Sequence, residues 1–250
     1  MQSHAITRVR RETRRRKMKV DAVTRVTPRM LRFDFISDDL HDFDSAAHDD
    51  HVKLFVPDPR NPDEPNKRDF TPRSFDPAGG TLTLDFALHD AGPATEWAVK
   101  AKAGDTIEIG GPRGSTVVTD DFDWYVLIGD ETALPAIGRR VENLRPGVPV
   151  FTFMTVAGEN EAQIFKTQAA HTPTWIVRSP QVADEAALKA ALEKLKLPPG
   201  DGFVWVGAEA SVARAMRDYF FEVHKHPKSW IKAAGYWKRG AVSTHEKIED

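Results

Sequence analysis

The stretch RDFTPRSFD, residues 68–76, holds two arginines, two aromatic rings and a threonine within nine positions. Arg68 can neutralise a phosphate, and the ring of Phe70 can stack on a flat heterocycle. The Thr71 hydroxyl can exchange a hydrogen bond with a ring nitrogen. A flavin dinucleotide offers all three features. The alternative is an ordinary strand with its aromatic ring inside and its arginines in water.

A second segment, HDAGPATEWAVK at 89–100, has the sequence of a helix start. Gly92 followed by Pro93 places proline at the first helical position. The backbone amides of Ala94 and Thr95 would then face outward at the positive end of the helix dipole, where a pyrophosphate fits. An ordinary helix that packs Trp97 into the core explains the segment as well.

Three further segments carry polar residues at turns. GDETALPA, residues 129–136, is a small-residue turn from a strand into a helix, and open α/β sheets bind ligands at such turns. GGPRGS, residues 110–115, is a glycine turn with Arg113 at its tip. HDDH, residues 48–51, invites a metal site, but a solvated loop explains it and we predict no metal. The chain has no GxGxxG in its second half, and no Walker A, HExxH or GxSxG motif anywhere.

The composition restricts the function classes. The 250 residues include 35 basic and 37 acidic side chains and no cysteine. Disulfides, thiolate nucleophiles and iron–sulfur ligation are therefore excluded, and redox chemistry would need a bound organic cofactor. No apolar run approaches ~20 residues, so we expect no membrane span, no signal peptide and a cytoplasmic location.

The stretch RVRRETRRRKMK at 8–19 has eight basic residues and one acidic residue. This density is typical of a nucleic-acid-binding arm or an amphipathic anchor. It also suits a solvated end that leads into the first strand. Because no aromatic residue is interleaved for base stacking, we favour the second interpretation and predict no nucleic-acid partner.

The hydrophobic pattern predicts two domains. Apolar and polar residues alternate, as in strands, at 52–56, 81–89 and 106–109. In the second run the alternation places Leu82, Leu84, Phe86 and Leu88 on one face. Several such short strands favour a small antiparallel barrel. Continuous apolar runs at 124–129, 150–156, 174–177 and 203–207 read as strands buried on both faces. The clearest helix is 184–197, with Asp184 as candidate N-cap. We expect a basic segment (1–18), the barrel (19–120), a parallel-sheet α/β domain (121–240) and a tail (241–250).

The order of seven segments resembles the siderophore-interacting proteins, FAD-binding ferric-siderophore reductases related to the ferredoxin–NADP reductases. The resemblance covers about residues 16–240 and implies an antiparallel Greek-key FAD-binding barrel followed by a parallel-sheet nucleotide-binding domain. The segments are DDHVKLFVP, RDFTPRSFD, LDFALHDAGPATEWA, AGDTIEIGGPRGS, GDETALPAI, VWVGAEASVARAMRDY and AAGYWKRG.

The resemblance also implies site residues. The family's arginine-x-tyrosine-threonine motif falls on Arg68 to Thr71, with Thr71 near flavin N5 as the candidate catalytic residue. Phe70 replaces the tyrosine, which removes a possible hydrogen bond to the ribityl chain. The predicted FAD-binding residues are Arg68, Asp69, Phe70, Thr71, Phe86, His89, Gly92, Ala94, Thr95 and Trp97. The predicted NAD(P)H-binding residues are Asp130, Glu131, Thr132, Gly207 and Glu209.

By the same resemblance, a cationic pocket for the ferric siderophore falls on Lys53, Arg113 and Lys232. A cationic patch would concentrate anionic siderophores near the flavin. The donor is NADPH, NADH or, as in some members, reduced ferredoxin. Glu159 and Glu161 occupy the place where a 2′-phosphate usually meets basic residues, which favours NADH or a protein donor. The tail at 241–250 lies beyond the resemblance.

Two other functions stay open on the sequence alone. A general NAD(P)H:flavin or ferredoxin reductase on the same scaffold would reduce soluble dyes well and ferric siderophores poorly. A nucleic-acid-binding module working through residues 8–19 would be colourless and would bind in a strongly salt-dependent way. Balanced net charge, at -2, weighs against the module.

Overall fold

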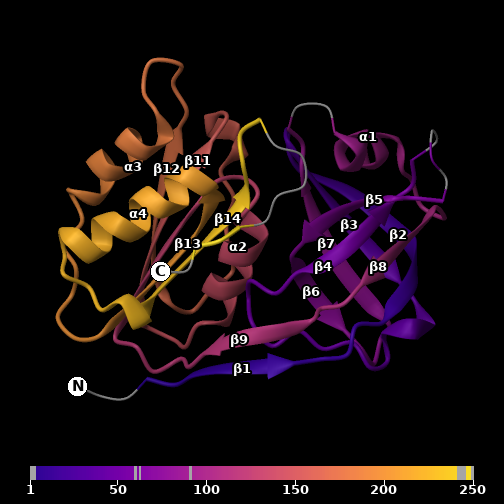
Figure 1. Cartoon of the computed structure of the whole chain (residues 1–250), viewed down its shortest axis with the longest axis horizontal. Coiled ribbons are helices and arrows are strands. Elements are labelled where there is room, and N and C mark those ends of the chain that lie inside the picture. The colour runs from indigo at the N-terminus through magenta and orange to yellow at the C-terminus, as the bar shows by residue number, and fades with distance from the viewer. Residues whose placement is uncertain (1–3, 59–60, 62, 90–91, 241–245, 249–250) are drawn as a thin grey trace. The chain divides into compact units, whose positions relative to one another are not determined.

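The computed structural model describes residues 4–58, 61, 63–89, 92–240 and 246–248 (Figure 1). The chain forms two compact units, one of residues 5–118 and one that contains His4 and the chain from Thr119 onward. Each unit has its own hydrophobic core. None of the helices in the described ranges is long and apolar enough to cross a membrane.

The first unit contains a seven-stranded sheet in the order β5-β4-β8-β2-β3-β7-β6, in which every neighbouring pair is antiparallel. Its edge strands β5 and β6 are joined by Thr71 alone, so the sheet must curl for the chain to pass from one edge to the other. The predicted antiparallel barrel is confirmed. Its strands are β2 (Arg15–Thr27), β3 (Met30–Ile36), β4 (Val52–Val56), β5 (Asn66–Phe70), β6 (Pro72–Asp76), β7 (Thr81–Ala87) and β8 (Thr106–Gly110).

Alternating side chains fill this barrel. Leu82, Leu84 and Phe86 of β7 are at most 1% exposed, as the sequence pattern predicts, and they meet Phe33 of β3 in the core. One short helix, α1 (Pro93–Lys100), packs Trp97 against the same core. Outside the barrel sheet, β1 (Ile6–Arg10) pairs with β9 (Gly114–Val118), and η1 (Asp38–Leu40) is a single 3₁₀ turn.

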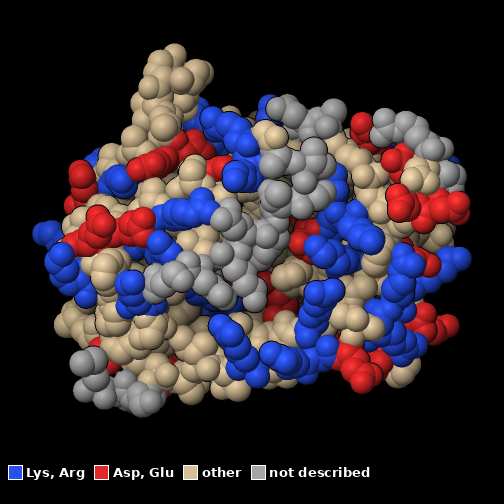
Figure 2. Space-filling model, in the orientation of Figure 1, with Lys and Arg blue, Asp and Glu red and all other residues tan. Residues whose placement is uncertain are grey.

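The basic stretch at 8–19 pairs with an acidic segment of the same unit. Arg14 donates to Asp39 at 2.9 Å and to Asp42 at 3.0 Å, while Arg16, only 6% exposed, donates to Asp42 at 2.9 Å. The hydrogen bond from Arg16 lowers the pKa of Asp42 to about 2. Arg11 pairs with Asp44. Acidic and basic side chains also lie beside each other on the face of the barrel unit drawn in Figure 2. These arginines therefore serve internal ion pairs.

The second unit is built on a six-stranded sheet in the order β12-β11-β10-β13-β14-β15. The first five strands are parallel, as predicted, and β15 is antiparallel to β14. The elements are β10 (Trp124–Gly129), α2 (Leu134–Asn143), β11 (Pro149–Val156), η2 (Glu159–Glu161), β12 (Ala170–Val177), α3 (Asp184–Leu192), β13 (Gly202–Glu209), α4 (Ala210–Glu222), η3 (Lys228–Trp230), β14 (Ile231–Trp237) and β15 (Glu246–Lys247).

Helices cover both faces of this sheet. Leu188 of α3 and Met216 of α4 join one core cluster with Val126 of β10, so α3 and α4 share a face (Figure 1). Gly129 faces α2, because a Cβ added there would lie 3.0 Å from the Ile137 side chain. The parallel strands are therefore buried on both sides, which explains their continuous apolar runs.

The N-cap predicted at Asp184 is wrong by one residue. Ala183 has the extended backbone of the cap, and Asp184 is the first helical residue. The Asp184 carboxylate accepts a hydrogen bond from Arg178 Nε at 2.8 Å instead. The helix also ends at Leu192, earlier than residue 197, because a tighter turn follows, with the amide of Lys194 bonded to the carbonyl of Ala191.

His4 is fixed against the second unit. Its side chain is 1% exposed and stacks on Phe122 with ring centroids 3.8 Å apart. Nδ1 lies 2.9 Å from an oxygen of Asp121, and Nε2 lies 3.3 Å from an oxygen of Asp201. Burial lowers the pKa of His4, but the two carboxylates more than offset this effect and raise it above 6.5.

A raised histidine pKa makes this contact pH-dependent. The folded state binds the proton more tightly, so the stabilisation is complete below pH 6.5 and is lost as the pH rises through the folded pKa. We expect His4→Gln to lower the melting temperature at pH 6 by about 2 °C, and by less at pH 9. Thermal unfolding followed by circular dichroism measures this difference, and an equal loss at both pH values would contradict it.

Candidate functional site

The edge strand β5 separates the predicted site residues onto two faces. In the register with β4, Phe70 lies opposite Val52 and Arg68 lies opposite Leu54, and both partners are completely buried. Arg68 and Phe70 therefore share the core-facing side of the strand, two positions apart. Asp69 lies on the other side, away from these two predicted cofactor residues.

Phe70 rests on an aromatic cluster. Its half-buried ring lies 4.3 Å from the ring of Phe86, centroid to centroid, and Phe86 lies 5.8 Å from Trp97. Phe86 itself is 1% exposed, because it points into the barrel from β7. It therefore supports the Phe70 ring from the core and has no surface of its own to offer a ligand. Trp97 is half-buried at the rim of this cluster.

Arg68 is partly withdrawn from water. Burial lowers the pKa of its guanidinium, and one of its nitrogens donates to the carbonyl of Lys67 at 2.8 Å. Thr71 follows at the junction of the two barrel edges and is 7% exposed. A guanidinium binds phosphate through charge-assisted hydrogen bonds, so a dinucleotide phosphate is an anion that Arg68 can hold.

The N-cap residue of α1 cannot supply a side-chain cap. It is Gly92, in extended backbone, and Pro93 follows at the first helical turn. Ala94 and Thr95 are half-buried on this turn. Backbone amides at a helix N-terminus bind anions, and the sequence predicts the pyrophosphate of FAD as the anion at this end of α1. Predicted His89 is exposed, and residues 90–91 lie outside the described residues.

The predicted substrate residues of the first unit lie on the outer face of the barrel sheet. Lys53 of β4 is opposite Asp69 of β5 and opposite Gly110 of β8. Lys53 Nζ lies 2.7 Å from both carboxylate oxygens of Asp69. Gly110 leads into the turn that carries Arg113, which is exposed at the turn's tip. Lys232, the third predicted residue, is half-buried on β14 of the other unit.

Asp130 joins three strand ends of the α/β unit. It is 3% exposed and follows β10 directly. Its Oδ1 accepts from the amide and hydroxyl of Thr132, and its Oδ2 accepts from Glu209 N at 3.1 Å and from Trp237 Nε1 at 2.8 Å. Burial raises the pKa of this carboxyl group. All four donors are neutral, so Asp130 acts as a hydrogen-bonding centre between β10, β13 and β14.

Glu209 continues this network. Its carboxylate caps α4 by accepting from Ser211 N at 2.7 Å, and it also accepts from Arg239 N at 3.2 Å. Burial raises the pKa of Glu209, but the hydrogen bonds to its carboxylate lower this pKa by more, so the net shift is downward. Gly207 lies two residues before Glu209. A side chain does not fit at this position, because an added Cβ would lie 2.5 Å from the Trp205 ring. The predicted residues directly after β10 and at the carboxyl end of β13 therefore lie where the strand order reverses, which is the usual ligand position in such sheets.

Glu131 is engaged by an arginine that the sequence prediction missed. Arg178 donates to Glu131 Oε1 at 2.5 Å, to Asp184 at 2.8 Å and to Thr155 at 3.3 Å. The sequence feature that could have identified Arg178 is its position directly after an apolar run, at the carboxyl end of β12. Of the two glutamates predicted to disfavour NADPH, Glu161 is 3% exposed, so only Glu159 faces water.

The HDDH segment has a structural role at Asp50. This carboxylate is 5% exposed and accepts from Ser45 Oγ at 3.0 Å, from Ala47 N at 3.0 Å and from Ser115 Oγ at 2.6 Å. Within the described ranges, no group of three or more acidic or histidine side chains is arranged to hold a metal ion.

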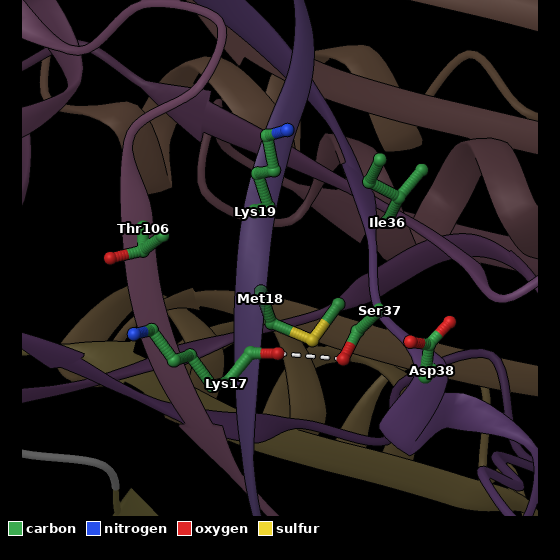
Figure 3. Close-up of a pocket in the computed structure, with 7 residues that line it drawn as sticks. All are labelled: Lys17, Met18, Lys19, Ile36, Ser37, Asp38 and Thr106. Carbon is green, nitrogen blue, oxygen red and sulfur yellow. Dashed lines mark hydrogen bonds between the residues drawn. The ribbon is translucent and has the colours of Figure 1, made fainter.

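A separate hollow of about 310 Å³ is lined by residues of β2, β3, η1 and β8 (Figure 3). The hydroxyl of Ser37 donates to the carbonyl of Lys17 across it, at 2.6 Å. None of the predicted site residues lines this hollow. Its lining residues are Lys17, Met18, Lys19, Ile36, Ser37, Asp38 and Thr106.

Comparison with known proteins matches both units. Residues 122–240 match the family described as siderophore-interacting protein, and residues 19–66 and 60–116 match the siderophore-interacting FAD-binding domain. The NADPH-dependent ferric-chelate reductase of Escherichia coli is 30% identical over 92% of this chain and 95% of its own. The ferric vibriobactin reductase ViuB of Vibrio cholerae is 27% identical over 86% of each chain.

Solved structures agree with the sequence matches. The crystal structure of a siderophore utilization protein from T. fusca superposes with a TM-score of 0.88 and 34% identity, over 96% of this chain and 98% of that one. The resemblance inferred from seven ordered segments is thus confirmed across both units, together with the fold that it implied. This chain belongs to the siderophore-interacting protein family.

Proposed function

We propose that the protein is an FAD-dependent ferric-siderophore reductase. The match of the barrel to a siderophore-interacting FAD-binding domain supports this proposal, as do the ferric-chelate and ferric vibriobactin reductases among its relatives. The observation that carries it is the shared face of Arg68 and Phe70 on the edge strand β5, directly before Thr71. A cation, a flat ring and a hydroxyl are thereby presented together.

Each of these residues has a proposed part in holding FAD. Arg68 and the backbone amides of Ala94 and Thr95 bind the pyrophosphate, and Phe70, supported by Phe86, stacks on the flavin ring. The Thr71 hydroxyl bonds at the reacting edge of that ring. When bound, FAD supplies the conversion between hydride donors and one-electron acceptors such as ferric iron.

Iron release follows from the change of charge on the metal. The hard oxygen ligands of a siderophore hold Fe(III) tightly and Fe(II) weakly, so one electron frees the iron. No side-chain acid, base or nucleophile is needed. Lys53, Arg113 and Lys232 are proposed to contact the ferric complex. We assign the reaction to the cytoplasm, where nicotinamide donors are available.

NADPH is the proposed donor, in line with the name of the Escherichia coli relative. The proposed binding site is the carboxyl edge of β10 and β13, at Asp130 to Thr132 and Gly207 to Glu209. Glu159, exposed after β11, argues for NADH. Comparing turnover with NADPH, NADH and reduced ferredoxin decides between the donors.

The visible absorption spectrum of the purified protein tests the function. We expect flavin bands that bleach under anaerobic addition of NADPH and return when a ferric siderophore is added, while a ferrous chelator reports Fe(II). A yellow protein that stays reduced with every ferric complex would point to a general flavin or ferredoxin reductase. A colourless protein that cannot be reconstituted with FAD would refute the cofactor assignment.

A further inference from the structure

Lys53 does not stand alone on the barrel surface. It forms a cross-strand ion pair with Asp69, with its Nζ 2.7 Å from both carboxylate oxygens. The lysine side chain is 47% exposed and the aspartate side chain 18%. The carboxylate therefore lies deeper, and the exposed ammonium group has a counter-charge fixed beneath it.

The nearby exposed cation is placed differently. Arg113 is exposed and lies three residues beyond Gly110, the β8 residue that is opposite Lys53 of β4; we call the surface carrying Lys53, Asp69 and Arg113 the rim of the barrel unit. Among the residues that the structure describes, no side-chain partner is found for Arg113. The rim thus combines one exposed guanidinium with one neutralised lysine, and its net positive charge is lower than the two cations suggest.

This charge arrangement affects anionic and neutral ligands differently. An isolated lysine attracts any anion, and more strongly the higher its charge. A lysine paired with a carboxylate still donates hydrogen bonds, but the carboxylate repels a highly charged ligand over nearly the same distance. Ferric complexes span this range, because tris-hydroxamate complexes are neutral and tris-catecholate complexes carry three negative charges.

We propose that Asp69 is a specificity-determining residue that, by neutralising Lys53, adapts the rim to neutral hydroxamate complexes and against triply anionic catecholate complexes. This inference rests on the proposed function and names its substrate class. Asp69 occupies the variable position of the arginine-x-aromatic-threonine motif, so charge selection and flavin binding are encoded on opposite faces of one strand.

Binding of redox-inert gallium(III) complexes tests this selection without electron transfer. Dissociation constants for a neutral tris-hydroxamate and a trianionic tris-catecholate are measured by calorimetry on the FAD-loaded protein. We expect the wild type to bind the neutral complex at least as tightly as the trianion. Asp69→Asn should tighten the trianion about three- to tenfold and change the neutral complex less than twofold. Asp69→Glu, which keeps the charge, should retain the wild-type ratio.

Glu108→Gln is the matched control. Glu108 lies on β8, which pairs with the strand of Lys53, and forms a 3.3 Å ion pair with Arg15 of β2, with both side chains about half exposed. The Glu108→Gln substitution removes one negative charge, as Asp69→Asn does, but leaves the ion pair of Lys53 intact. The affinities for the neutral and the trianionic gallium complexes should therefore stay within twofold of the wild type. If Glu108→Gln equals Asp69→Asn in effect, or if Asp69→Asn shifts both complexes alike or neither, the inference is refuted.

The outcomes separate this inference from the proposed function. If the wild type reduces ferric complexes but Asp69→Asn leaves the binding ratio unchanged, the selectivity assignment fails and the reductase stands. If the wild type reduces no ferric complex, the proposed function fails whatever the ratio. Absence of binding of either gallium complex at millimolar concentration would overturn the inference as well.

Discussion

Arg68→Ala is expected to fold but to bind FAD about 10- to 100-fold more weakly, because a charge-assisted hydrogen bond to phosphate contributes about 1.5–3 kcal/mol. The half-buried guanidinium lies on the face of β5 that carries Phe70, so its loss removes the cation from the proposed pyrophosphate site. Titration of the FAD-free protein with FAD, followed by quenching of flavin fluorescence, measures the change.

The neighbouring Lys67→Ala provides the control for Arg68→Ala. Lys67 is exposed and alternates to the opposite face of the same strand, so its removal should change FAD affinity less than twofold. Equal losses for the two variants would show a general charge effect and contradict the assigned role. An Arg68→Ala protein that retains full FAD affinity would place the pyrophosphate elsewhere.

Much of the fold follows from side-chain periodicity. The alternation of Leu82, Leu84 and Phe86 predicted both the strand and its buried face, and the continuous apolar runs after residue 123 predicted the parallel sheet. The same alternation also conflicts with the cofactor role predicted for Phe86. A residue that shares a face with two core leucines is buried, and the structure places it there.

The pairs that tune the site could not be predicted, because they depend on strand register. Lys53 and Asp69 are 16 residues apart and meet only through the alignment of β4 with β5. The hydrogen bond between Asp130 and Trp237 spans 107 residues and needs the order of the parallel strands. Local pattern gives the type of element and its faces, whereas contacts between strand ends follow from tertiary packing.

Asp130→Asn is expected to lower the free energy of unfolding of the α/β unit by about 2–4 kcal/mol. An asparagine offers one acceptor oxygen where the carboxylate offers two, so its NH₂ group must face either the Thr132 amide, whose neighbouring hydroxyl can turn to accept, or the N–H donors of Glu209 and Trp237. In both orientations at least one hydrogen bond is lost and a buried N–H donor faces another donor. Urea unfolding followed by circular dichroism at 222 nm reports this change, because α2, α3 and α4 all belong to this unit.

Trp237→Phe measures the contribution of one hydrogen bond to Asp130, for comparison with Asp130→Asn, which disturbs several. It removes one donor to Asp130 and keeps an aromatic ring, so we expect a loss of about 1 kcal/mol. If Asp130→Asn costs no more than Trp237→Phe, the carboxylate does not connect the three strand ends. If it costs more but leaves the Michaelis constant for NADPH unchanged, Asp130 supports the sheet edge without contacting the donor. If the Michaelis constant for NADPH rises in Asp130→Asn but not in Trp237→Phe, binding of the nicotinamide donor requires the strand ends that Asp130 holds together.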